Sequence, residues 1–170
     1  MSKEYDYLLK IVLRGSRRVG KQSILNYLVG ELKNQNLYLS NRDFSIRSIK
    51  VDQLSIKIQV WDLALFERFR SIIQKLIKQA NIIIFIFDLT NEESFEDVTY
   101  YIDELKDAAY GKISKILVGN KCDLEPSISN DKIQTRALEL GLTYLEISVK
   151  TGLNLDLLFE IVCRDYIYKN

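Results

Sequence analysis

Hydrophobic positions follow two spacings along the chain, and each change of spacing predicts a change of secondary structure. Short apolar or alternating runs predict strands at 7–13, 44–51, 54–61, 82–89, 115–119 and 144–147. Apolar residues three and four positions apart predict helices at 21–32, 66–79, 92–105, 131–140 and 155–168. Strands and helices therefore take turns over almost the whole chain.

This alternation is typical of a parallel sheet with right-handed crossover connections. Only Asp52 and Gln53 separate residues 44–51 from 54–61, so these two segments predict a hairpin with one antiparallel strand at an edge. The predicted fold class is α/β, a doubly wound, six-stranded, mostly parallel sheet with helices on both faces.

The composition suits a single domain covering residues 1–170. The chain is 47% hydrophobic and 28% charged, and a chain of this length buries roughly 70% of the surface of its unfolded state. Lys plus Arg number 24 and Asp plus Glu number 23, so the net charge of +1 disfavours nucleic acid as a partner. The longest apolar stretch is far shorter than the ~20 residues of a membrane helix.

The cysteines and the first residues of the chain indicate the cellular compartment of the protein. Cys122 and Cys163 do not follow the spacing of metal ligands, and the chain contains no histidine. The first residues are too charged for a secretory signal peptide. These features favour a reducing, cytosolic location.

Residues 15–23 carry the clearest chemical motif. Gly15 and Gly20 lie five positions apart, between an apolar strand and the helix that begins with Lys21. In a P-loop this arrangement cradles phosphates on backbone N–H groups. The motif has a Ser or Thr after the lysine as a Mg²⁺ ligand, but here Gln22 follows and Ser23 comes one position later. An ordinary strand-to-helix turn is the alternative interpretation.

Other polar segments follow later strands of the predicted sheet. Asp62 comes after the third strand, residues 120–123 after the fifth and residues 148–150 after the sixth. Ligands of doubly wound sheets bind beyond the carboxyl ends of the strands. We therefore expect these segments and the glycine-rich loop to line one crevice.

These motifs resemble the Ras superfamily of small GTPases, and its Rab branch most closely. Besides the P-loop, the resemblance rests on residues 61–62 (WD), 67–70 (ERFR), 88–95 (DLTNEESF), 117–124 (LVGNKCDL) and 146–152 (EISVKTG). It implies a P-loop NTPase fold of the small G-domain type, with GDP or GTP as the ligand.

The resemblance gives Asn120, Lys121 and Asp123 roles in binding guanine. The Asp123 carboxylate would accept two hydrogen bonds from guanine that adenine cannot donate. Asn120 would tether neighbouring loops, and the stem of Lys121 would cover the base. A helix-capping Asn beside a solvated Lys and Asp is the alternative interpretation. The candidate nucleotide-binding residues are Gly15, Ser16, Arg17, Arg18, Val19, Gly20, Lys21, Gln22, Ser23, Asn120, Lys121, Asp123, Leu124, Ser148, Val149 and Lys150.

Departures from the family's motifs gather on the phosphate side. Arg17 occupies the position of a family glycine, where a guanidinium would crowd the γ-phosphate or bind it. Leu65 occupies another glycine position, and Phe66 stands where the family has the glutamine that orients the attacking water. We therefore assign no catalytic residue.

The candidate metal ligands are Gln22, Ser40 and Asp62. Counting forward from the P-loop aligns Ser40 with the family's Mg²⁺-binding threonine, whereas counting back from Asp62 aligns Leu39. We expect Mg²⁺ binding to be weak or absent.

One departure lies on the base side of the site. Lys33 stands where the family has an aromatic residue under the guanine.

The sequence therefore predicts a Rab-like guanine-nucleotide-binding protein of vesicle traffic or signalling, with strongly reduced or absent GTP hydrolysis. The main alternative is a pseudo-GTPase interaction module that binds little or no nucleotide. An active P-loop kinase or ATPase is disfavoured by the guanine motif. We expect effector or regulator proteins as partners. We also expect a cytoplasmic location, or a peripheral one on endomembranes through a lipidated tail or a partner.

Overall fold

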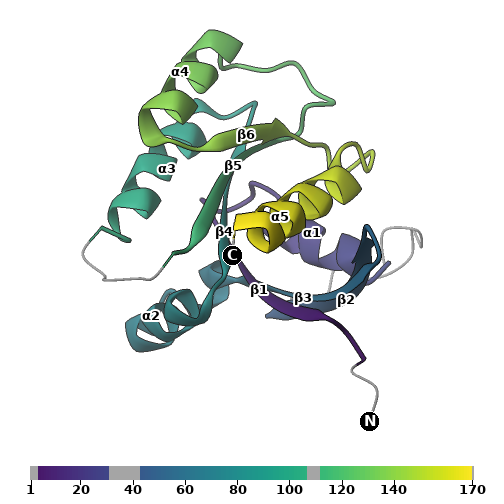
Figure 1. Ribbon diagram of the computed structural model, residues 1–170. Coiled ribbons are helices and arrows are strands. Elements are labelled where there is room, and N and C mark those ends of the chain that lie inside the picture. The colour runs from purple at the N-terminus through teal and green to yellow at the C-terminus, as the bar shows by residue number, and fades with distance from the viewer. Residues whose placement is uncertain (1–3, 31–42, 107–111, 170) are drawn as a thin grey trace.

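The computed structural model describes residues 4–30, 43–106 and 112–169 (Figure 1). Its central sheet has six strands in the order β2-β3-β1-β4-β5-β6. The strands are β1 (Tyr7–Arg14), β2 (Phe44–Val51), β3 (Leu54–Asp62), β4 (Ile82–Asp88), β5 (Ser114–Asn120) and β6 (Thr143–Glu146). Only β2, at one edge, pairs antiparallel within this sheet. The predicted α/β fold class and its antiparallel edge strand are confirmed.

Helices cover both faces of the sheet (Figure 1). They are α1 (Lys21–Leu28), the short 3-10 helix η2 (Leu63–Phe66), α2 (Arg70–Gln79), α3 (Glu92–Asp103), α4 (Asn130–Leu140) and α5 (Leu155–Lys169). Buried residues of α1 and α5 pack on one face, and those of α2, α3 and α4 pack on the other. None of the helices in the described ranges is long and apolar enough to cross a bilayer.

Strand β4 shows how the sequence produces two cores. All seven of its residues are buried. Ile82, Ile84 and Ile86 join the core under α1 and α5, whereas Ile83, Phe85 and Phe87 join the core under α2 and α3. Successive side chains of a strand point to opposite faces, so an unbroken apolar run is what a strand covered on both sides requires.

Three predicted helices differ from the structure by two or more residues at one end. The helix predicted at 92–105 ends at Asp103. The helix predicted at 66–79 begins only at Arg70, because Phe66 belongs to η2, which begins where the Asp62 side chain accepts a hydrogen bond from the Ala64 N–H. The helix predicted at 21–32 ends at Leu28, and the Gly30 N–H then turns back to the Tyr27 carbonyl. Residues 31 and 32 lie outside the described ranges.

The other elements are close to their predicted positions. Strand β4 ends one residue earlier than predicted, at Asp88, and β5 is one residue longer at each end. Strand β6 is shifted by one residue towards the N-terminus, and α4 and α5 each gain one terminal residue.

Asn91 provides a test of the N-terminal cap of α3. Its side chain accepts a hydrogen bond from the Ser94 N–H at the start of that helix. We expect Asn91→Ala to lower the free energy of unfolding by about 0.5–2 kcal/mol, because the first turn loses its cap. Urea denaturation measures the change. Asn130→Ala, at the exposed first residue of α4, where Ser129 and not Asn130 is the cap, is the control and should leave stability nearly unchanged. Equal effects of the two substitutions would contradict the assignment.

Candidate nucleotide-binding site

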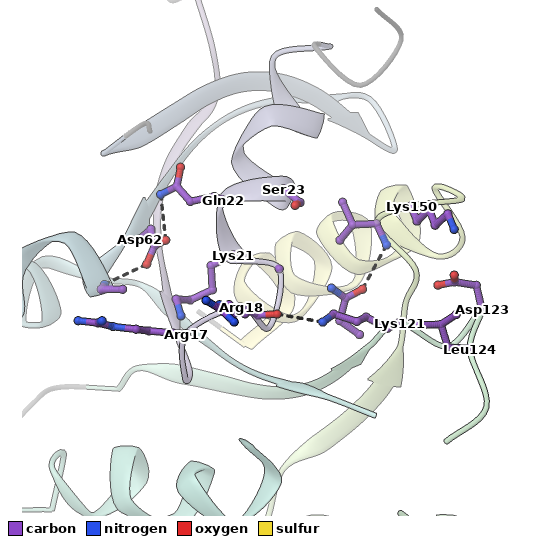
Figure 2. A pocket seen from close by; sticks show the side chains of 14 residues that line it. Arg17, Arg18, Lys21, Gln22, Ser23, Asp62, Lys121, Asp123, Leu124 and Lys150 are labelled. Carbon is purple, nitrogen blue, oxygen red and sulfur yellow. Dashed lines mark hydrogen bonds between the residues drawn. The ribbon is translucent and has the colours of Figure 1, made fainter. Parts of the chain in front are cut away.

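A cavity of about 680 Å³ opens at the carboxyl ends of the strands, and Figure 2 shows the side chains around it. Segments far apart in the sequence line it, as the polar residues after the strands predict. The lining residues are Arg17, Arg18, Gly20, Lys21, Gln22, Ser23, Asp62, Ala64, Asn120, Lys121, Asp123, Leu124, Val149 and Lys150. Gln22 and Asp62 lie at one end in this view, and Asp123 and Leu124 lie at the other.

The loop after β1 folds around the side chain of Lys21. Its Nζ donates hydrogen bonds to the carbonyl oxygens of Gly15 and Ser16, each at 2.6 Å. Burial lowers the pKa of Lys21, and the nearby Asp62 carboxylate acts in the opposite direction. The ammonium group is therefore positioned by its own loop at the inner wall of the cavity.

Two close approaches explain the glycines of this loop. Gly20 has a φ of 108°, and a Cβ atom there would lie 2.2 Å from Asn120 Nδ2. A Cβ atom on Gly15 would lie 2.2 Å from the carbonyl oxygen of Ile86 on β4. A side chain at Gly15 would displace the backbone of β4, and one at Gly20 would displace the Asn120 amide and strain the backbone.

Asn120 joins the two loops that flank the cavity. At the end of β5, its Nδ2 donates to the Val19 carbonyl at 2.8 Å, and its Oδ1 accepts from the Val149 N–H at 3.2 Å. The residue is only 3% exposed. This is the tethering role that the family resemblance implies for it.

Lys121 is held from two sides. Its Nζ donates to the Arg18 carbonyl at 3.0 Å and forms an ion pair with Asp88 at the end of β4. Burial acts to raise the pKa of Asp88, but hydrogen bonds from Lys121 and Thr90 outweigh it and hold the pKa below its usual value. Asp88 therefore keeps a negative charge that anchors the lysine.

Asp123 is oriented by Ser148, whose hydroxyl donates to its Oδ1 at 2.6 Å. The carboxylate is otherwise exposed at the mouth of the cavity. The Ser148 oxygen itself accepts from the Thr151 N–H, so the hydroxyl hydrogen points at Asp123. The second carboxylate oxygen accepts no hydrogen bond from the residues that the structure describes.

At the opposite end of the cavity, Gln22 contacts Asp62. Gln22 Nε2 donates to Asp62 Oδ2 at 3.0 Å, and Asp62 Oδ1 accepts from the Ala64 N–H at 2.9 Å (Figure 2). The aspartate is only 2% exposed. Each of its two oxygens therefore has a donor within the protein.

Phe66 lies outside the cavity lining and packs with other aromatic residues. Its ring centroid is 6.3 Å from that of Trp61, which in turn stacks on Phe44 at 4.6 Å. Arg17 lines the cavity from a well-exposed position, with one guanidinium nitrogen 3.9 Å from a Glu67 carboxylate oxygen.

The structure separates the sequence-predicted residues into two groups. Most line the cavity, whereas Gly15, Ser16, Val19 and Ser148 support it from behind through the hydrogen bonds given above. Ser40, Leu39 and Lys33 lie outside the described residues, so the roles predicted for these positions stay predictions.

Sequence reasoning missed Asp88 and Ala64. Asp88 ends a buried strand next to β5, so the rule that ligands gather at carboxyl ends could have found it. Ala64 contributes a backbone N–H, which no residue pattern would mark.

Comparison with known proteins identifies the family. The sequence model of the Ras family matches residues 10–168. The chain belongs to the Ras family.

Several Rab proteins are similar to this chain over nearly its whole length. Ras-related protein Rab-13 of Bos taurus is 34% identical over 173 residues, covering 100% of this chain and 85% of the relative. Ras-related protein Rab-8A of Bos taurus is 35% identical over 169 residues, covering 97% of this chain and 81% of the relative. The chain is therefore a Rab-like member of the family.

Asn120 offers a test of how the site is held together. We expect Asn120→Ala to lower the free energy of unfolding by about 1–3 kcal/mol, because the Val19 carbonyl and the Val149 N–H lose their partner in a buried place. Chemical denaturation gives the loss. Amide hydrogen exchange at Val149 should accelerate by more than the global loss of stability accounts for; unchanged exchange there would contradict the tether.

Proposed function

We propose that this Rab-like protein binds a guanine nucleotide in the cavity, with the base near Asp123 and the phosphates at the loop of residues 15–21. Ser148 donates one hydrogen bond to the Asp123 carboxylate, whose remaining lone pairs can accept from the N1–H and the exocyclic amine of guanine. Adenine has no matching pair of donors, so its binding would leave a charged acceptor unpaired. The ordered Asn120 and Lys121 support the same assignment.

At the phosphate end of the cavity, the side chains favour nucleotide binding without an ordinary Mg²⁺ site. Mg²⁺ requires oxygen ligands in a nearly octahedral arrangement. At this end Gln22 presents its amide N–H₂ group to Asp62, and an N–H donor cannot ligate a cation. The described residues also contain no group of three or more His, Cys, Asp or Glu side chains that could hold a metal ion. These residues do not fit a strong Mg²⁺ site.

The hydrogen bond between Gln22 and Asp62 is the single observation that carries this proposal. It puts a neutral donor where the family resemblance implies a metal, so Asp62 is stabilised whether or not a nucleotide is present. We propose weak or absent Mg²⁺ binding, with Lys21, Arg17 and Arg18 as the cations near the phosphates.

Hydrolysis is proposed to be very slow or absent. Phe66 packs in the aromatic group of Trp61 and Phe44, and a phenyl ring has no polar atom to orient water. The protein would then act in vesicle traffic or signalling through effector or regulator proteins. It would be cytoplasmic or peripheral on endomembranes, with a lipidated tail or a partner as the attachment.

A pseudo-GTPase interaction module is the second candidate. One observation favours it. The Lys21 ammonium group already donates to two carbonyl oxygens of its own loop, instead of to a ligand. Identifying the nucleotide that co-purifies with the protein separates the two candidates: bound GDP or GTP supports the first, and an empty protein that ignores added guanine nucleotide supports the second.

Guanine specificity can be measured by titration with labelled nucleotides. GDP should bind at least a hundredfold more tightly than ADP, because adenine leaves Asp123 unpaired. Asp123→Ala should remove this preference. Glu125→Ala, at an exposed residue two positions away that does not line the cavity, is the control and should keep it. Equal affinity of the unmodified protein for ADP and GDP would sink the proposal.

Metal dependence gives a second measurement. Chelation of Mg²⁺ with EDTA should accelerate GDP release by less than about threefold in the unmodified protein. Gln22→Ser removes the amide that bonds Asp62 and supplies a hydroxyl ligand, so release from this variant should become sensitive to EDTA. Gln53→Ser, on the exposed hairpin turn, is the matched control. Strong sensitivity of the unmodified protein would show that Mg²⁺ is bound there in the ordinary way.

Single-turnover GTP cleavage completes that experiment. The unmodified protein should cleave GTP more slowly than the intrinsic rate of a small GTPase, which is on the order of 10⁻⁴ s⁻¹. Gln22→Ser should not restore cleavage, because Phe66 still leaves the attacking water without a partner. Cleavage at the intrinsic family rate by the unmodified protein would contradict the assignment.

A further inference from the structure

The loop of residues 15–21, here the phosphate loop, is connected to α3 at two points beside its first residue. Arg14 Nη2 donates to Glu104, the residue that ends α3, at 2.5 Å. Two positions along the chain, the Ser16 hydroxyl donates to Asp97 Oδ2 at 2.6 Å. Asp97 and Glu104 are seven positions apart, so they lie about two turns apart on one side of the helix. None of these four residues is among those that line the nucleotide cavity.

The Arg14 contact is the more buried of the two. The Arg14 side chain is 8% exposed, and the centre of its guanidinium group lies 4.5 Å from the ring centroid of Tyr101. Tyr101 lies between Asp97 and Glu104 in the sequence of the helix. A buried guanidinium without its carboxylate is strongly destabilising. This pair therefore fixes the end of β1 against α3, at the point where the phosphate loop begins.

The Ser16 contact reaches the lysine of the phosphate loop. While the Ser16 hydroxyl donates to Asp97, the Ser16 carbonyl oxygen accepts from Lys21 Nζ at 2.6 Å. The peptide group is planar, so these contacts also fix the peptide that joins Ser16 to Arg17. Arg17 and Lys21 both line the cavity. One serine thus connects α3 to the ammonium group at the inner wall of the cavity.

We propose that Asp97 is a positioning residue for the phosphates of the bound nucleotide. Through Ser16 it fixes the carbonyl group that holds the Lys21 ammonium group, so the loop has its binding shape before a nucleotide arrives. A preorganised site avoids the cost of ordering the loop on binding. This inference rests on the proposed function, which puts the phosphates at the phosphate loop.

The place of the contact predicts which nucleotides depend on it. GDP has a β-phosphate that GMP lacks, whereas the base that Asp123 would bind is the same in both. A loop that must first be ordered therefore weakens GDP more than GMP. General damage to the fold would weaken both nucleotides alike, so the ratio of the two affinities separates a positioning role from a merely structural one.

Competition against fluorescently labelled GDP gives the affinities of the full chain for GDP and GMP. Asp97→Leu should lower the GDP affinity at least fivefold and the GMP affinity less than twofold. Asp97→Asn keeps an oxygen that accepts from the Ser16 hydroxyl, so the ratio of affinities should stay within twofold of the unmodified protein. Asp103→Leu is the matched control and should change neither affinity, because Asp103 is exposed on the same helix and pairs with Lys106. An unchanged ratio in Asp97→Leu, or an equal fall in Asp103→Leu, would overturn the proposal.

Ser16→Ala removes the donor of the same hydrogen bond. It should also lower the ratio of GDP to GMP affinity, and the double variant with Asp97→Leu should lose no more than the weaker-binding single variant, because both changes act through one bond. Additive losses would overturn the proposal. If Asp97→Leu fails to fold, Ser16→Ala decides alone, and an unchanged ratio in that variant would overturn it.

Backbone ¹⁵N relaxation of the nucleotide-free protein separates this inference from the proposed function. The order parameters of Ser16 and Arg17 should fall in Asp97→Leu and stay unchanged in Asp103→Leu. Unchanged order parameters in a protein that binds GDP would overturn the positioning role and leave the proposed function standing. If the unmodified protein binds no guanine nucleotide, the proposed function fails and the role of Asp97 towards phosphates fails with it, whatever the order parameters show.

Discussion

The candidate site depends first on the two hydrogen bonds of Asn120. Its amide reaches the Val19 carbonyl on one side and the Val149 N–H on the other, so a single buried side chain sets the distance between the phosphate loop and the loop after β6. The approach is so close that only glycine fits opposite it, at Gly20. Because the loops come from distant parts of the chain, this bridge depends on the sheet that brings them together.

The aspartates at the two ends of the cavity differ in how many of their oxygens already accept hydrogen bonds from the protein. At the Asp123 end, Ser148 donates to one carboxylate oxygen, and the other accepts no hydrogen bond from the described residues, which suits an external donor. At the Asp62 end, both oxygens already have donors from Gln22 and Ala64. A buried acceptor that is satisfied by its own protein gains little from a new partner, and this asymmetry underlies the proposal of nucleotide binding with little metal chemistry.

The sequence predicted the sheet well because strand periodicity and burial are local properties. The apolar run of β4 needs only covering helices to become a two-faced core strand, and both cores form as its alternation requires. The predicted start of α2 was wrong, because the Asp62 side chain accepts a hydrogen bond from the Ala64 N–H and a 3-10 helix begins there instead. Helical spacing cannot reveal such a competing hydrogen bond.

The candidate site was predictable for the same reason and up to the same limit. Carboxyl ends of parallel strands meet at one edge, which brings Lys21, Asn120 and Asp123 to one cavity without any knowledge of side-chain contacts. The partners that orient these groups were not predictable. Asp88 holds Lys121, and Gln22 holds Asp62, through pairings across 33 and 40 residues of sequence.

The phosphate loop is also tied to the helices beside it. The Ser16 hydroxyl donates to Asp97 on α3 at 2.6 Å, and Arg14, directly before the loop, donates to Glu104 of the turn that ends the same helix. Arg18 adopts a φ of 64°, a left-handed conformation that costs a non-glycine residue roughly 1–2 kcal/mol. Contacts on both sides of Arg18, from α3 at Ser16 and from Asn120 at Val19, hold the loop in this conformation. The strain at Arg18 is therefore sustained by the tertiary fold.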